Sequence, residues 1–178
     1  MATDEILTAL GYLRFAPNID SQDDRIVIQK ITYLLKKLGF GINFKFERRS
    51  RGPYSMNLDK EMWMYRDEYE MLQSPKPTDT QKRILNHLKE SVPIEVSRLE
   101  GAASAVYLME DAYPKMDESG IKEKLRIWKE NFSEEQLTIS MNDAKKLMFK
   151  EEYVTPELKN ELSAWMRLGS AVVLSQPA

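Results

Sequence analysis

The sequence predicts a mainly α-helical single domain, a bundle of about seven helices with one small β-hairpin between helices two and three. Three observations lead to this prediction. Apolar residues recur at helical spacing along most of the chain. Helix-capping sequences and helix-ending Gly or Pro residues divide that pattern into segments. Alternation of apolar and polar residues, which is typical of a strand, is clear only over residues 40–47.

A chain of 178 residues fits one domain, and its hydrophobic content of 42% is sufficient for a core. The absence of cysteine excludes disulfides, thiolate nucleophiles and Cys-type zinc sites, and it fits a reducing cytoplasm. A formal net charge of −2 provides no long-range field that attracts nucleic acid or an anionic membrane. No apolar run approaches the ~18 residues that a membrane span needs. We therefore expect a single cytoplasmic domain over residues 1–178.

The N-terminal part is predicted to hold two helices, at residues 4–15 and 21–38. Pro17 ends the first helix, and the sequence 21–24 resembles a capping box that opens the second. The second helix is expected to be amphipathic, with an apolar stripe in the core. Its opposite, polar side presents Gln29, Lys30, Tyr33 and Lys37.

Three apolar residues alternate with polar ones over residues 40–47, which predicts a half-buried strand. Since a strand needs a partner, the hairpin is expected to be completed around residues 49–51. The Gly52-Pro53 pair then predicts a turn, and Ser55 is the expected N-cap of a third helix that ends near Gln73.

The third helix carries apolar residues on two sides. Its regular stripe at helical spacing consists of Leu58, Met62, Tyr65, Tyr69 and Leu72. A second set lies on the other side and consists of Met56, Trp63, Met64 and Met71. Such a helix is either sandwiched inside the domain or exposes an apolar patch to a partner, and both interpretations stay open.

The second half of the chain is predicted to be helical almost throughout. Capping boxes at residues 78–81 and 133–136 begin two helical segments, and Pro93 begins another. The small residues 101–105 are expected to let another helix approach closely. The later helices are expected at residues 93–110, 121–132, 141–151 and 155–169, and residues 170–178 are either a docked segment or a frayed end.

Motifs of the common enzyme classes are absent from the sequence. The seven glycines form neither a dinucleotide-binding fingerprint nor a P-loop, and no metalloprotease or serine-hydrolase motif occurs. The single histidine, His87, is expected to be structural or solvent-facing. We predict no catalytic residue, no cofactor and no metal. A metal-dependent hydrolase or nuclease built from carboxylates is the third-ranked hypothesis.

The densest basic cluster precedes the Gly52-Pro53 turn and consists of Lys45, Arg48, Arg49 and Arg51. It lies where a strand or turn leads into a helix N-terminus, whose free N–H groups favour an anion. A phosphate or an acidic partner segment is therefore one expected ligand. The alternative is that these arginines pair with local acids such as Asp59 and Glu61.

Two motifs, in order, resemble one known family. The helix sequence 25–35 contains Gln29, Lys30 and Tyr33, and the sequence Gly52-Pro53-Tyr54-Ser55 follows about twenty residues later. This arrangement resembles the Panacea domain, which includes SocA-like antitoxins and YwgA-like proteins, over residues 24–73. The chain departs from the family pattern in its Arg-rich turn, where many relatives have aromatic residues.

The resemblance implies a mainly helical, non-enzymatic domain that holds a partner protein. Characterised relatives act as antitoxins that bind a toxin, and SocA also delivers its toxin to a protease. Partners differ widely among relatives, so the identity of the partner does not carry over. An architectural role is the alternative for the motif, in which Tyr33 and Tyr54 lock the second helix to the turn.

The leading hypothesis is a protein-interaction module of antitoxin or proteolytic-adaptor type, with a toxin encoded nearby as the first candidate partner. The alternative is a DNA- or RNA-binding regulator with a winged-helix-like helix–strand–turn unit. No membrane partner is expected. Tyr33, Lys37, Tyr54 and Trp63 are expected to share one partly exposed surface. The full set of expected partner-binding residues is Gln29, Lys30, Tyr33, Lys37, Arg48, Arg49, Arg51, Gly52, Pro53, Tyr54, Ser55 and Trp63.

Overall fold

The computed structural model describes residues 3–112 and 116–149, and this part of the chain is mainly helical. It holds eight helices and one two-stranded antiparallel hairpin, and the hairpin lies between the second and third helices as predicted. The predicted helix at 155–169 and the tail at 170–178 lie outside the described residues. The elements are α1 (Asp4–Tyr12), α2 (Gln22–Lys37), β1 (Glu47–Arg49), β2 (Gly52–Tyr54), α3 (Met56–Met64), α4 (Arg66–Met71), α5 (Asp79–Ser91), α6 (Val96–Ala112), α7 (Glu118–Trp128) and α8 (Glu134–Met148).

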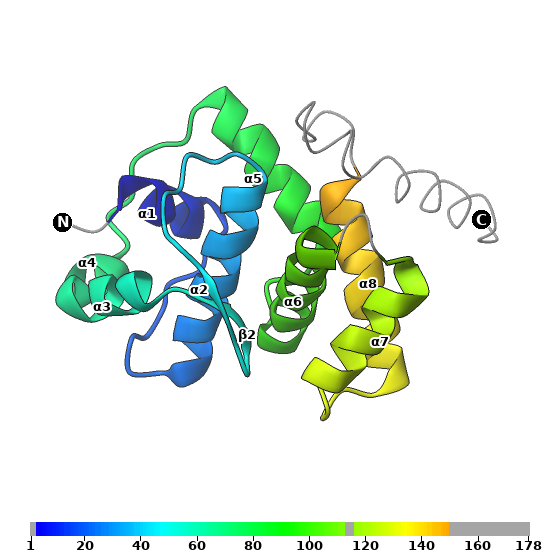
Figure 1. Cartoon of the computed structure of the whole chain (residues 1–178). Coiled ribbons are helices and arrows are strands. Elements are labelled where there is room, and N and C mark those ends of the chain that lie inside the picture. The colour runs from blue at the N-terminus through cyan, green and yellow to red at the C-terminus, as the bar shows by residue number, and fades with distance from the viewer. Residues whose placement is uncertain (1–2, 113–115, 150–178) are drawn as a thin grey trace.

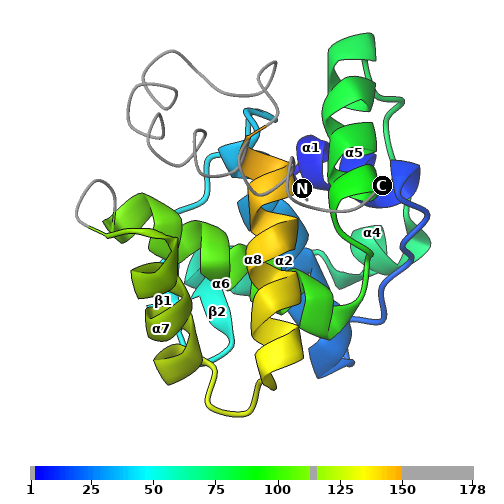
Figure 2. The ribbon, with the colours of Figure 1, turned by 90° about the vertical axis from the view of Figure 1, so that its right-hand side faces the viewer.

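Helices α2 and α6 lie at the centre of the molecule (Figure 1). Helices α1, α3 and α4 lie on one side of α2, and α7 and α8 lie beyond α6 on the other side. The hairpin crosses the central pair, because β2 packs on both α2 and α6. The side view shows α8 crossing in front of α6, its most extensive partner (Figure 2). This arrangement places the core around α2 and α6.

Helix α2 begins at the N-cap Ser21, whose side chain accepts a hydrogen bond from the Asp24 backbone N–H. The prediction that this helix has an exposed polar side is wrong. All ten residues from 26 to 35 are buried, including Gln29, Lys30 and Tyr33. The reason is tertiary: β2 and α6 cover the side that the sequence pattern assigns to solvent.

The hairpin pairs Glu47 with Tyr54 and Arg49 with Gly52. The predicted strand over residues 40–47 is wrong, because only Glu47 of that range belongs to β1. Burial still alternates along 41–46, with the apolar side chains packed inward. The segment has no partner strand among the described residues, so it is an extended chain that packs one side on the core.

Helices α3 and α4 replace the single helix predicted for residues 55–73. Ser55 caps α3 as predicted and accepts a hydrogen bond from the Leu58 N–H. The break lies at Tyr65, whose ψ of 34° departs from the helical value, and α4 ends at Leu72 in the left-handed region. The predicted stripe faces the core, where Leu58, Met62 and Tyr69 are buried.

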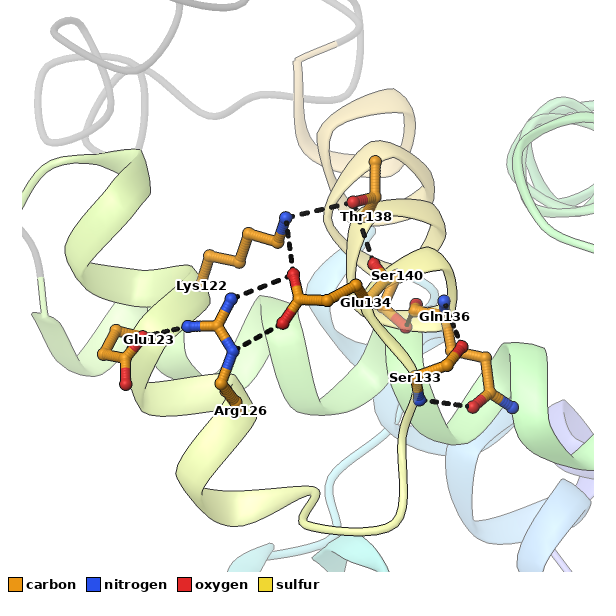
Figure 3. Close-up of polar contacts among 8 residues, drawn as sticks. All are labelled: Lys122, Glu123, Arg126, Ser133, Glu134, Gln136, Thr138 and Ser140. Atoms are coloured by element: carbon orange, nitrogen blue, oxygen red, sulfur yellow. Dashed lines mark hydrogen bonds and ion pairs between the residues drawn. The ribbon is translucent and has the colours of Figure 1, made fainter.

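The capping boxes predicted at Thr78 and Ser133 are both present and begin α5 and α8. Figure 3 shows the second box, together with the exposed ion pairs that Arg126 of α7 makes with Glu134 of α8. Helix α6 begins at Val96, so Pro93 lies in the turn before the helix instead of at its first position.

The small residues of α6 allow the close approach that the sequence predicts. A Cβ atom added to Gly101 would lie 2.0 Å from Oγ of Ser140 on α8 and 3.1 Å from the Phe132 ring. His87 is buried on α5 and contacts the Leu147 carbonyl of α8 through Nε2 at 2.9 Å. The histidine is therefore structural, one of the two roles expected for it.

Candidate protein-interaction surface

The motif residues of α2 hold the hairpin and the start of α3. The Gln29 side-chain amide donates to the Ser55 carbonyl at 2.8 Å and accepts from the Ser55 N–H at 2.8 Å. The Lys30 ammonium donates to the Pro53 carbonyl at 2.7 Å. Because these backbone groups are buried, the two side chains provide hydrogen bonds that water does not supply. Gln29, Lys30, Pro53 and Ser55 thus form one structural unit, and their expected exposure to a partner is wrong.

A group of charges surrounds the buried Glu100 beneath the hairpin. Glu100 of α6 accepts hydrogen bonds from Arg51 Nε at 2.7 Å and from Lys129 Nζ at 2.8 Å. Lys129 also donates to the Ser50 carbonyl at 2.9 Å. Burial lowers the pKa of Lys30 to about 7; Glu100 opposes the shift, and the positive charges of Lys129 and Arg51 add to it. Three cations from α2, the hairpin turn and α7 therefore share one carboxylate.

Gly52 brings β2 close to both central helices. Its φ of 100° lies in the left-handed region. A Cβ atom at this position would lie 2.7 Å from Oγ of Ser104 and 3.3 Å from Cε of Lys30. Glycine is thus favoured at this position, because a side chain would strain the backbone and require Ser104 to move.

Tyr33 is a core residue with 1% of its surface exposed. Its ring contacts Phe46 edge to face, with centroids 5.3 Å apart, and Tyr107 at 6.3 Å. The ammonium of Lys37 lies 5.4 Å from the ring centroid and forms an ion pair with Glu110 at 2.6 Å. Burial raises the pKa of Tyr33, and Glu110 raises it further. The expectation that Tyr33 lies on a partner-facing surface is wrong, since residues of the 41–46 segment and α6 cover it.

The three hairpin arginines are exposed, but each contacts another side chain of the fold. The Arg48 guanidinium stacks over Trp128 at 4.3 Å, and Arg49 pairs with Glu47 at 3.5 Å. Arg51 pairs with Glu100. The predicted pairing with local acids therefore holds only for Arg49, and neither Asp59 nor Glu61 pairs with these arginines; Arg48 contacts a ring of α7 and Arg51 pairs with an acid of α6.

The exposed face of α3 carries three large apolar side chains beside the polar Asn57 and Lys60. Met56, Trp63 and Met64 expose 52%, 47% and 71% of their surfaces, and Met71 of α4 exposes 69%. At 3.6 residues per turn, the three α3 residues and the exposed Lys60 fall within about 100° of one another, opposite the buried Leu58 and Met62. Of the two interpretations left open, the exposed patch is correct and the sandwiched helix is wrong.

Tyr54 connects this face to the hairpin. It is half-buried, and its pKa is raised by burial and by the Asp59 carboxylate. The positive charges of Arg49 and Arg25 both oppose that rise. Arg25 also lies 4.9 Å above the Trp63 ring. We define the α3 surface as Arg25, Tyr54, Met56, Lys60, Trp63 and Met64.

Sequence reasoning found Tyr54 and Trp63 but missed the other four members. A signal was present for Met56 and Met64, which belong to the second apolar set of the third helix. No local signal marks Arg25, because its place over Trp63 depends on how α3 returns to the start of α2.

Within residues 3–112 and 116–149, no group of three or more His, Asp or Glu side chains is placed to hold a metal ion. No helix in the described part is both long and apolar enough to cross a membrane. No protein-family model, curated protein or solved structure matches this chain. The α3 surface is therefore interpreted from its own chemistry.

Proposed function

We propose that this chain is a non-enzymatic protein-binding module of the Panacea type that neutralises or delivers a partner protein by stoichiometric binding. The observation that supports this most strongly is the α3 surface. A Trp and two Met side chains share the solvent-facing side of one helix, where a solvated helix carries polar residues.

The residue types of this surface are those of binding hot spots. Trp, Tyr and Arg contribute most of the energy at protein interfaces, and Met is enriched there as well. Trp63, Tyr54 and Arg25 supply the first three, and the cation over the Trp63 ring holds that ring in a defined position. The unbranched Met56 and Met64 side chains adapt to the shape of a partner.

The Panacea-like motif supports the proposal indirectly. Gln29 and Lys30 fix the backbone at Pro53 and Ser55, directly before α3 begins. In this proposal the motif is the shared frame, and the residues of α3 that follow it select the partner. That division explains why relatives with one motif hold different partners.

A nucleic-acid-binding regulator is the competing function, and the hairpin arginines are the observation in its favour. Each of the three already has a partner within the fold, so phosphate binding has to compete with an existing contact. If phosphates were the ligand, binding to duplex DNA or RNA would weaken steeply with salt. Salt-sensitive, sequence-selective retention in a gel shift would favour this function over ours.

Co-expression with the product of the adjacent gene tests the proposal. We expect that product to be toxic alone and harmless when this chain is present. Trp63→Glu and Met64→Glu place a charge in the middle of the α3 surface, so each should abolish protection and weaken complex formation at least tenfold. Ile127→Glu is the matched control, because Ile127 is equally apolar and exposed (65%) but lies on α7.

The outcome separates surface recognition from loss of fold. Complex formation is measured with purified proteins by calorimetry, and thermal melts of each variant report folding. If the two α3 variants protect as well as the native chain, or if Ile127→Glu fails with them, the α3 surface is not the binding site.

A further inference from the structure

A cleft separate from the α3 surface opens between the end of α2, the 41–46 segment and the end of α6. Its volume is about 330 Å³, at the lower end of the range for small-molecule sites. The aromatic part of its wall is formed by Phe46 and Tyr107, with the buried Tyr33 in contact with both rings. No residue of the α3 surface lines it.

The charges of the cleft do not cancel. Three lysines and two carboxylates line it, and Lys37 is neutralised by Glu110 at 2.6 Å. Among the described residues Lys36 donates to the Phe44 carbonyl and forms no ion pair, which leaves its positive charge in place. Within the described residues, Lys45 and Asp111 have no ion-pair partner. Two cations therefore face one carboxylate, which makes the open part of the cleft a site for an anion.

We infer that this cleft binds a mononucleotide, with the phosphate held by Lys36 and Lys45 and the base packed against Phe46 and Tyr107. Phosphate matches the two ammonium groups, and a planar base matches the aromatic wall. The ribose hydroxyls and an exocyclic amino group supply donors for Asp111, the remaining acceptor. An acidic peptide side chain would use the lysines and leave the rings without a partner, so a nucleotide fits the whole wall better.

Calorimetric titration of the full chain with adenosine 5′-monophosphate tests this inference, with adenosine and inorganic phosphate as the two half-ligands. We expect the nucleotide to bind at least tenfold more tightly than either half at the same ionic strength, because both parts of the site contribute. Absence of binding at millimolar nucleotide would overturn the inference. Phosphate that binds as tightly as the nucleotide would also overturn it, since the aromatic wall would then contribute nothing.

Two lysine variants locate the site. Lys45→Glu reverses an exposed cleft charge and should weaken nucleotide binding at least tenfold. Lys76→Glu makes the same charge change in the exposed linker before α5, and it should leave affinity within about twofold of the native value. If both variants weaken binding equally, the effect is one of overall charge and the assignment to this cleft is wrong. The test does not depend on protein binding, so the two proposals succeed or fail separately.

Discussion

Two regions of the molecule bring a cation against an aromatic ring, and they differ in what covers the ring. At Tyr33 the ammonium of Lys37 is 5.4 Å from the ring centroid. The rings of Phe46 and Tyr107 pack against Tyr33, and only 1% of its surface is exposed. At Trp63 the Arg25 guanidinium is 4.9 Å away, and 47% of the residue stays open.

The comparison shows that the family-like motif and the candidate binding surface overlap only at Arg25 and Tyr54, while Gln29, Lys30 and Tyr33 of the motif are buried. Tyr33 belongs to the motif and serves the core, whereas Trp63 lies outside the motif and faces solvent. Substitutions in the two regions should therefore affect different properties: stability in the first, and partner binding in the second.

The largest effect is expected at Tyr33. Tyr33→Ala removes a fully buried ring and should lower the free energy of unfolding by about 3–5 kcal/mol. Leu35→Ala, on the same helix, should cost about 2–5 kcal/mol. Urea unfolding measures both. A Tyr33→Ala protein as stable as the native chain would show that the ring is not part of the core.

A smaller loss is expected at Gln29, whose amide satisfies both backbone groups of Ser55. Gln29→Ala leaves the buried Ser55 N–H without a partner, whereas the Ser55 carbonyl keeps its bond from the Asp59 N–H, and the substitution should cost about 1–3 kcal/mol. The control is Gln22→Ala at the exposed start of α2, which should change stability by less than about 0.5 kcal/mol. Equal effects of the two substitutions would show that the hydrogen bonds between Gln29 and Ser55 do not stabilise the fold.

Lys30 should make stability depend on pH. Its pKa is lowered to about 7 in the folded state, so between that value and the ordinary 10.5 the unfolded chain binds more protons than the folded one. The contribution of Lys30 to the free energy of unfolding therefore rises with pH across this window, and below about pH 7 the buried charge has its full cost. Urea unfolding at several pH values, native chain against Lys30→Met, should give a difference that rises by about 1 kcal/mol per pH unit. In the control Lys76→Met, the free energy of unfolding should keep the pH dependence of the native chain. A difference between the native chain and Lys30→Met that does not change with pH would contradict the lowered pKa of Lys30.

The smallest effect on stability is expected at Trp63. Trp63→Ala should lower the free energy of unfolding by less than about 1 kcal/mol, because the half-exposed ring loses little buried area and one cation–π contact. The same substitution should weaken complex formation about tenfold or more. Thermal melts and calorimetry on one preparation give both numbers. A melt as severe as that of Leu35→Ala would place Trp63 in the core and remove it from the binding surface.

The sequence predicts well those features whose cause is local. The caps at Ser21, Ser55, Thr78 and Ser133 each depend on a hydrogen bond to a residue three positions on. The hairpin position follows from Gly52, where the backbone needs a glycine.

The features that sequence reasoning missed have causes far along the chain. Gln29 and Lys30 are polar, so a pattern of polarity assigns them to solvent, yet β2 and α6 bury them. The alternation at 41–46 reflects packing on one side and looks the same as that of a strand. The helix break at Tyr65 could not be predicted, because no Gly or Pro lies at that position. The small-residue run in α6 was interpreted only as a contact for another helix, but it also lets the hairpin approach at Ser104.

The hydrogen bonds that α7 gives to the hairpin also bear on the order in which the chain folds. Trp128 donates to the Arg49 carbonyl and Lys129 to the Ser50 carbonyl, and each pair is 79 residues apart in sequence. During synthesis from the N-terminus, α2 and the hairpin emerge long before α6 and α7. Until then Lys30 has no Glu100 to offset its charge, and burying it is unfavourable. We therefore expect the hairpin to dock only after α6 and α7 have been synthesised.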